Sequence, residues 1–245
     1  MRNWILTSAL GTSLLIGGAM ALPVVGLRAE DAPVSAAQKA KDARIVKALL
    51  SLSDVDLSSK PEAKASLLRY LTAHHGTEKY VEIVTRFKLA EGTDELLRMA
   101  IEDSEGSLGA QAAGALVKLD QGERINQELR KPETATGVKL LNAIKLSGDA
   151  KANAVVLPLV TDAEVPSAIR TGAVSLLGAN LPGQKALLGL VTEGKLLPEQ
   201  KFAAASSLLS SMDKAIKTEA GKHLQLPATA DSKPLPGRRT GKAIG

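Results

Sequence analysis

Cysteine is absent from the 245 residues of this chain. Its absence excludes zinc and iron–sulfur sites held by thiolates, enzymes with a thiol nucleophile, and the two-cysteine signature that attaches haem covalently. It also excludes disulfide bonds. The folded part must therefore be stabilised by an ordinary buried apolar core.

Aromatic residues make up only 2% of the chain. After residue 29 they are Tyr70, Tyr80, Phe87 and Phe202, which are too few to stack a run of bases. No nucleic-acid partner is expected on this ground.

The positive charge is concentrated at the ends of the chain. The formal net charge is +5, yet residues 213–245 carry +4 and residues 30–212 carry −1. A nucleic-acid-binding domain normally carries its basic surface on the folded part, so the charge distribution also argues against such a partner. We expect residues 223–245 to form a solvated basic tail containing proline and glycine.

The N-terminal segment has the layout of a secretory signal peptide. Arg2 precedes a mostly apolar run from Trp4 to Leu27, and the small-residue stretch RAEDA follows. We predict cleavage after Ala29, with Ala21 as the alternative site. The apolar run also reaches the length of a membrane anchor, so membrane attachment is expected only if the segment stays uncleaved. Both cases predict an exported, periplasmic or secreted protein.

Apolar residues between 43 and 221 recur with the period of an α-helix. In PSAIRTGAVSLLG, for example, Ile169, Ala173, Leu176 and Leu177 share one helical face. The run AVVLPLV at 154–160 is β-branched enough for a strand, but its internal proline argues against one. The pattern predicts an all-α chain with helices at 37–52, 61–74, 77–88, 92–102, 107–119, 121–130, 133–146, 149–160, 165–178, 183–193, 197–211 and 213–222.

The segment GANLPG predicts the end of one helix and the start of the next. Gly178 and Asn180 tolerate a left-handed turn at a helix end, and Pro182 suits the first turn of the following helix. Similar units recur, because the tripeptides SLL, KLL, SLL and SLL begin at residues 66, 139, 175 and 207. Intervals of 36 and 32 residues are the length of two short helices with their turns.

One segment resembles a HEAT repeat. LPLVTDAEVPSAIRTGAVSLLG, residues 157–178, has a leucine–proline pair, then Asp162, then the pair Ile169 and Arg170, then alanine and leucines. The resemblance implies an α-solenoid of stacked antiparallel helix pairs. It further implies that Asp162 caps the following helix and ties the turn, and that Arg170 packs along the neighbouring repeat.

A narrower resemblance covers most of the chain. Segments such as DARIVKALLSLSDVDLSSKPEAKASLLRYL and GKLLPEQKFAAASSLLSS are similar to the HEAT region of large secreted bacterial proteins in which a c-type cytochrome domain follows. This resemblance implies association with a haem protein or a dehydrogenase. The haem-attachment motif of that family is missing here, so no cofactor is expected on this chain.

The sequence offers few residues for chemistry. His74 and His75 with Glu78 could be imagined as metal ligands, but adjacent histidines point to different faces of a helix, so we interpret them as helix-end residues. Ser211 and Lys214 have a serine–lysine spacing without the companion motifs of acyl transferases. We therefore predict no catalytic, cofactor-binding or metal-binding residues.

These observations divide the chain into a signal peptide (1–29), a linker (30–43), a HEAT-like domain (44–222) and the basic tail (223–245). They predict a non-catalytic exported scaffold or protein-interaction module. The alternative is a HEAT-like lyase or a protein that handles a ligand or pigment.

Overall fold

The computed structural model describes residues 34–53 and 55–225 of the chain. In these ranges it contains twelve α-helices, one short 3-10 helix (Ala90–Gly92) and no strand. The chain is therefore all-α, as predicted. The helices are α1 (Ala36–Leu50), α2 (Pro61–Thr72), α3 (Glu78–Phe87), α4 (Thr93–Glu102), α5 (Ser107–Lys118), α6 (Gly122–Leu129), α7 (Thr134–Ser147), α8 (Ala152–Val160), α9 (Ser167–Leu177), α10 (Leu181–Thr192), α11 (Pro198–Leu209) and α12 (Lys214–His223).

Each predicted helix is present, and most ends differ by a few residues. Helix α1 begins at Ala36, inside the segment 30–43 that was expected to be a linker, because Ser35 accepts a hydrogen bond from the backbone N–H of Gln38 at 3.2 Å and caps the helix. The run 154–160 is helical and contains Pro158. The predicted signal peptide and most of the predicted tail lie outside the described residues.

The GANLPG turn differs from its prediction. Gly178 has a right-handed helical backbone, with φ −65°, and Asn180 is extended, with φ −142°. Asn180 is instead the N-cap of α10, where its side-chain oxygen accepts from the N–H of Gly183 at 2.9 Å. Pro182 lies in the first turn of α10, as expected. Asn180 also exchanges side-chain hydrogen bonds with Asn153 on α8, which fixes the turn against the preceding helix.

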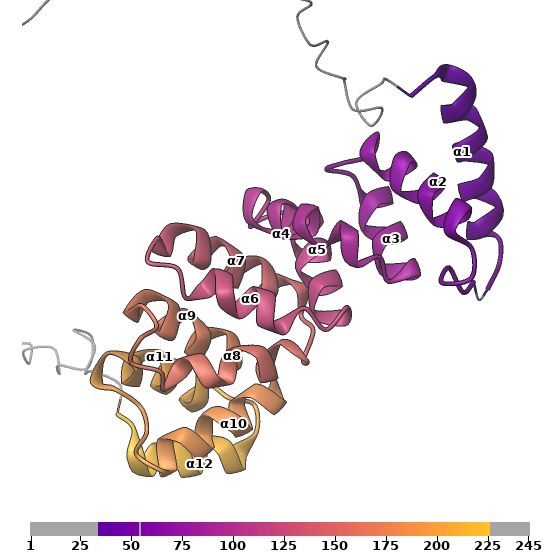
Figure 1. Ribbon diagram of the computed structural model, residues 1–245. Coiled ribbons are helices and arrows are strands. Elements are labelled where there is room, and N and C mark those ends of the chain that lie inside the picture. Colours follow the sequence, from indigo (N-terminus) through magenta and orange to yellow (C-terminus); the bar gives the residue numbers. More distant parts are fainter. Residues whose placement is uncertain (1–33, 54, 226–245) are drawn as a thin grey trace, which may run out of the picture.

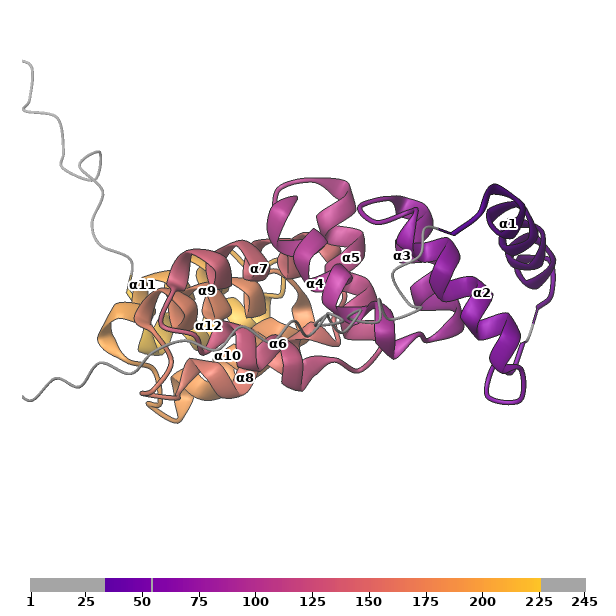
Figure 2. The ribbon, with the colours of Figure 1, turned by 45° about the horizontal axis from the view of Figure 1, so that its top comes forward.

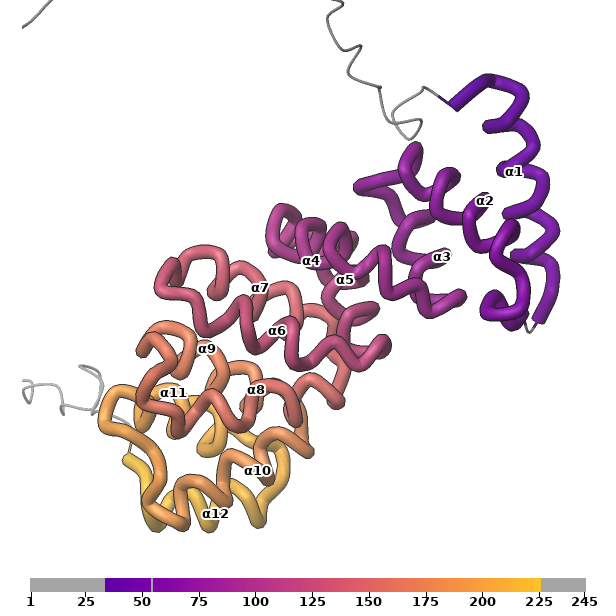
Figure 3. Tube along the Cα trace, in the orientation of Figure 1, coloured from indigo at the N-terminus to yellow at the C-terminus, as the bar shows by residue number. Residues whose placement is uncertain are grey.

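Nine of the twelve described helices form two rows along an elongated molecule. In one row α3, α5, α7, α9 and α11 each contact the next, and in the other α6, α8, α10 and α12 do the same. The rows meet through contacts such as α6 with α7 and α8 with α9. Figure 1 shows α1 at one end and α10 to α12 at the other, and the tilted view in Figure 2 shows the same order. The Cα trace in Figure 3 shows how short the connections are.

A continuous apolar core runs along the molecule, from Val46 on α1 to Leu224 after α12. Glycine allows close approach between α7 and α9 within it. A Cβ atom at Gly137 would lie 2.7 Å from Ile169 Cδ1, and one at Gly172 would lie 2.8 Å from Leu141 Cδ1. Each helix thus places a large side chain over a glycine of the other, as expected of close-packed interiors.

An ion pair between a buried carboxylate and a partly exposed arginine joins α1 to α2. The Asp42 side chain is 2% exposed and accepts from Arg69 Nε at 2.9 Å and Nη2 at 2.8 Å. Gln38 Nε2 also donates to it, at 2.9 Å. These hydrogen bonds, chiefly that from Arg69, lower the pKa of Asp42 below its ordinary value. The pair therefore stabilises the N-terminal end of the molecule when Asp42 is ionised.

The variant Asp42→Asn should lower the free energy of unfolding by about 1–2 kcal/mol at pH 7, because it removes charged hydrogen bonds to a buried group. Since the folded-state pKa is depressed, this contribution is present at neutral pH and is lost as the pH falls below the ordinary pKa of 3.8. Urea titrations at pH 7 and pH 3 should show the difference between wild type and variant shrinking. Glu62→Gln, at an exposed carboxylate on α2, is the control. An equal difference at both pH values would contradict the prediction.

None of the helices within residues 34–53 and 55–225 is both long enough and apolar enough to cross a bilayer.

Candidate interaction groove

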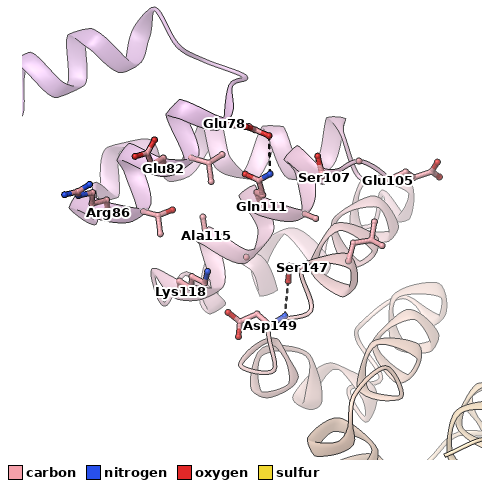
Figure 4. Close-up of a pocket in the computed structure, with 16 residues that line it drawn as sticks. Glu78, Glu82, Arg86, Glu105, Ser107, Gln111, Ala115, Lys118, Ser147 and Asp149 are labelled. Atoms are coloured by element: carbon pink, nitrogen blue, oxygen red, sulfur yellow. Dashed lines mark hydrogen bonds between the residues drawn. The ribbon is translucent and has the colours of Figure 1, made fainter. Parts of the chain in front are cut away.

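An open groove of about 810 Å³ lies across α3, α5 and the C-terminal end of α7. Figure 4 shows side chains from these three elements lining it. The N–H of Tyr80 donates to the side chain of Thr77, which starts α3, and α3 then directs Glu78 and Glu82 to the groove while Val84 is buried in the core. We call this hollow the α3–α7 groove.

Helix α5 fills little of the groove because several of its lining residues are small. Ala110, Gly114 and Ala115 line the groove, and Gly114 lies close to Ser147 of α7. Between the longer side chains of Gln111 and Lys118, which also line the groove, this helix presents only small residues, so a hollow remains between α3 and α7. At the edge of the groove lies Leu146, an apolar residue that is 52% exposed.

Acidic side chains outnumber basic ones in the groove. The carboxylates are Glu78, Glu82, Glu105 and Asp149, and the cations are Arg86 and Lys118. Glu82 pairs with Lys79 at 2.8 Å beside the groove, and Gln111 Nε2 lies 3.4 Å from a carboxylate oxygen of Glu78. Arg86 donates to the carbonyl oxygen of Leu52 at 2.5 Å, which directs it toward the α1–α2 connection. The groove has a net negative character, and it suits a positively charged ligand.

The structure separates the two adjacent histidines. The sequence predicted that these histidines end the helix over 61–74. Helix α2 instead ends at Thr72, so His74 and His75 both follow the helix. The ring of His74 stacks on Tyr70 with centroids 3.9 Å apart, whereas the ring of His75 lies edge-on to Tyr80 at 5.2 Å. In the described ranges no group of three His, Asp or Glu side chains could hold a metal ion.

Ser211 has a structural role in the turn before α12. Its hydroxyl donates to Gln184 Oε1 at 2.7 Å and accepts from the N–H of Asp213 at 3.1 Å. The residue is buried and links α10 to α12, while Lys214 is the first residue of α12. The serine–lysine spacing therefore reflects a helix start.

The glycine-containing segment before α5 forms a tight turn. The carboxylate of Asp103 accepts from the N–H of Gly109 at 3.0 Å. Nearby, Arg98 donates to both carboxylate oxygens of Glu95 and is the chief cause of its lowered pKa, and Oε1 of Glu95 also accepts from the N–H of Gly76 at 2.9 Å. The carboxylates of Asp103 and Glu95 stabilise connections between helices, and neither residue lines the groove.

The residues that carry the HEAT resemblance organise the α8–α9 turn. Arg170 donates to the carbonyl oxygens of Ala163 at 3.1 Å and Val165 at 2.9 Å, and to Glu199 of α11 at 2.9 Å. Arg170 thus joins α9 to α11.

Asp162 ties the same turn but does not cap α9. It accepts from the N–H of Glu164 at 3.0 Å and pairs with Arg130, and Arg130 is the main cause of its lowered pKa. The N-cap of α9 is Pro166, without a side-chain cap, so the implied capping role of Asp162 is wrong. The carboxylate of Asp162 bonds to the N–H of Glu164, and Val165 and Pro166 separate Glu164 from Ser167, the first residue of α9. Asp162 therefore lies too far before α9 to cap it.

Comparisons with protein-family models, curated proteins and solved structures found no match to this chain.

The groove was not predicted from the sequence. Of its charged residues, only Glu78 was considered, as a possible metal ligand. A usable signal was present: Glu78, Glu82 and Arg86 recur every four residues on α3, opposite an α5 helix made of small residues. Charged residues on one helix that face small residues on another indicate an open groove once the two helices are known to pack together.

Proposed function

We propose that this chain is a non-catalytic, exported scaffold built as a HEAT-like α-solenoid, and that it binds a protein partner through the α3–α7 groove. In such an array each helix pair buries its apolar face only by stacking on its neighbours, which leaves a long surface for binding.

The observation that carries the proposal is a set of polar links between successive units. Side chains 27 to 32 residues apart are repeatedly joined, an interval close to one repeat: Asn153 with Asn180, Gln184 with Ser211, Arg170 with Glu199, and Arg130 with Asp162. Links of this regular separation support an array of similar helix pairs better than a single compact bundle.

The proposed partner is a haem protein or a dehydrogenase. This identity follows from the sequence resemblance to HEAT regions that precede a c-type cytochrome domain, and the acidic groove adds that the contacting surface of the partner carries positive charge.

Purification of the tagged full chain from the envelope of its native cells tests this proposal. We expect haem absorbance or a dehydrogenase in the eluate of the wild type and of Glu123→Lys, an exposed control on α6. The groove variant Glu78→Lys/Glu82→Lys should retain about tenfold less, because like charges would then face the partner. Equal recovery with all three chains, or no haem protein or dehydrogenase with any, would overturn the proposal.

A further inference from the structure

The charge of the groove points to an occupant within the same polypeptide. We propose that residues 226–245 of this chain bind in the α3–α7 groove of the same molecule. This inference rests on the proposed use of the groove as an interaction surface, but its test requires no external partner.

Charge complementarity is the first argument. The groove lining carries four carboxylates against two cations, and one of the carboxylates, Glu82, also pairs with Lys79 beside the groove. Residues 226–245 carry the cations Lys233, Arg238, Arg239 and Lys242 against a single acidic residue, Asp231. This segment holds most of the excess positive charge of the chain, and the excess of carboxylates among the charged residues of the groove attracts it.

The apolar content of the two surfaces also matches. Leu146 presents a half-exposed apolar side chain at the groove edge, and Ala110 and Ala115 line its floor. The segment 226–245 carries Leu235 and Ile244 on either side of its paired arginines. Covering Leu146 removes apolar surface from water in addition to pairing charges.

The segment is long enough to reach. Helices α5, α7, α9 and α11 follow one another in one row, and α12 packs against α11. Packed helices lie about 8–10 Å apart, so α5 lies four such steps, about 32–40 Å, from α12, after which the described chain ends. Arg238 lies 13 residues after Gln225, a span of about 43 Å when extended. Figure 1 shows α12 at the far end of this row from α3.

The absence of cysteine makes a direct test simple, since any pair of introduced cysteines is the only pair in the chain. The test variant is the full chain with Gln111→Cys in the groove and Gly241→Cys in the tail. The matched control is Gln127→Cys with the same Gly241→Cys, because Gln127 is an exposed glutamine on α6, outside the groove lining.

Intramolecular disulfide formation under a mild oxidant, followed by mass spectrometry at low protein concentration and about 10 mM salt, should be at least tenfold faster for the test variant. In about 1 M salt the two rates should converge, because charge attraction is then screened beyond about 3 Å. Ser107→Cys, an isosteric change at the other end of the same groove wall, should repeat the result if the variant at 111 folds poorly.

Adding Arg238→Gln and Arg239→Gln to the test variant should slow the disulfide to the control rate. Equal rates for the test and control variants would overturn the proposal. So would an unchanged rate after the two arginine substitutions, or cross-linked dimers in place of the intramolecular product, since dimers would place the tail on a second copy. Circular dichroism of each variant confirms that the helices are intact.

Discussion

Replacing Leu176 by alanine should lower the free energy of unfolding by about 2–5 kcal/mol. Leu176 is 3% exposed on α9, the helix that contacts α7, α8, α10 and α11. Truncation removes apolar surface from the core and leaves a cavity that the packed helices on several sides can fill only in part. Urea-induced unfolding followed by circular dichroism measures the loss.

Leu181→Ala provides the matched control. The substitution is the same, but Leu181 starts α10 and is 45% exposed. Its truncation should change the free energy of unfolding by about 0.5 kcal/mol or less. Similar losses for both variants would mean that α9 does not pack as described.

Gly183→Ala should also destabilise the protein strongly, by about 3 kcal/mol, the upper end of the range for overpacking. Gly183 is buried in the first turn of α10, and a methyl group there would overlap the backbone carbonyl oxygen of Leu177 at the end of α9. A backbone atom cannot rotate away as a side chain can. The first turn of α10 would have to move from α9, and the cap that Asn180 makes with the N–H of Gly183 would weaken.

Replacing the glycine six residues later, Gly189, by alanine should change the free energy of unfolding in the opposite direction. Gly189 lies within α10, and a Cβ atom there would meet no other atom within 4 Å. Gly189→Ala should therefore stabilise the protein by about 0.5–1 kcal/mol, because alanine loses less backbone freedom on folding than glycine does. Thermal unfolding of the two variants should show melting temperatures shifted in opposite directions. Two shifts in the same direction would contradict the described contact between α9 and α10.

The helices could be predicted from the sequence because their apolar residues repeat with one period. Ile169, Ala173 and Leu177 on α9 are each fully buried, as the periodicity predicts. Pro158 lies within α8, so the mostly apolar run at 154–160 could be assigned to a helix from its proline.

Turn geometry could not be predicted as well. Asn180 has two competing uses, a left-handed helix end or an N-cap, and the sequence alone favoured the first. The structure shows why the second prevails: as an N-cap, Asn180 reaches both Gly183 and Asn153. Asn153 is 27 residues earlier in the chain, so this partner appears only when α8 and α10 are packed together.

The candidate groove depends on packing in the same way. Glu78 and Gln111 are 33 residues apart, and the contact between them exists only because α3 lies beside α5. Periodicity identifies the face of each helix that is buried, but it does not indicate which exposed faces lie together or leave a hollow between them. Helix neighbours therefore had to come from the structure.

Hydrogen exchange measured along the chain in wild type and in Leu176→Ala tests the central claim, an array of stacked helix pairs, most directly. In such an array stability is the sum of units and their nearest-neighbour contacts. We predict faster exchange in α9 and in its neighbours α7, α8, α10 and α11, with α1 to α3 close to the wild-type rates. Equal acceleration of the most protected amides in every helix, from α1 to α12, would show a single cooperative core and would contradict the account.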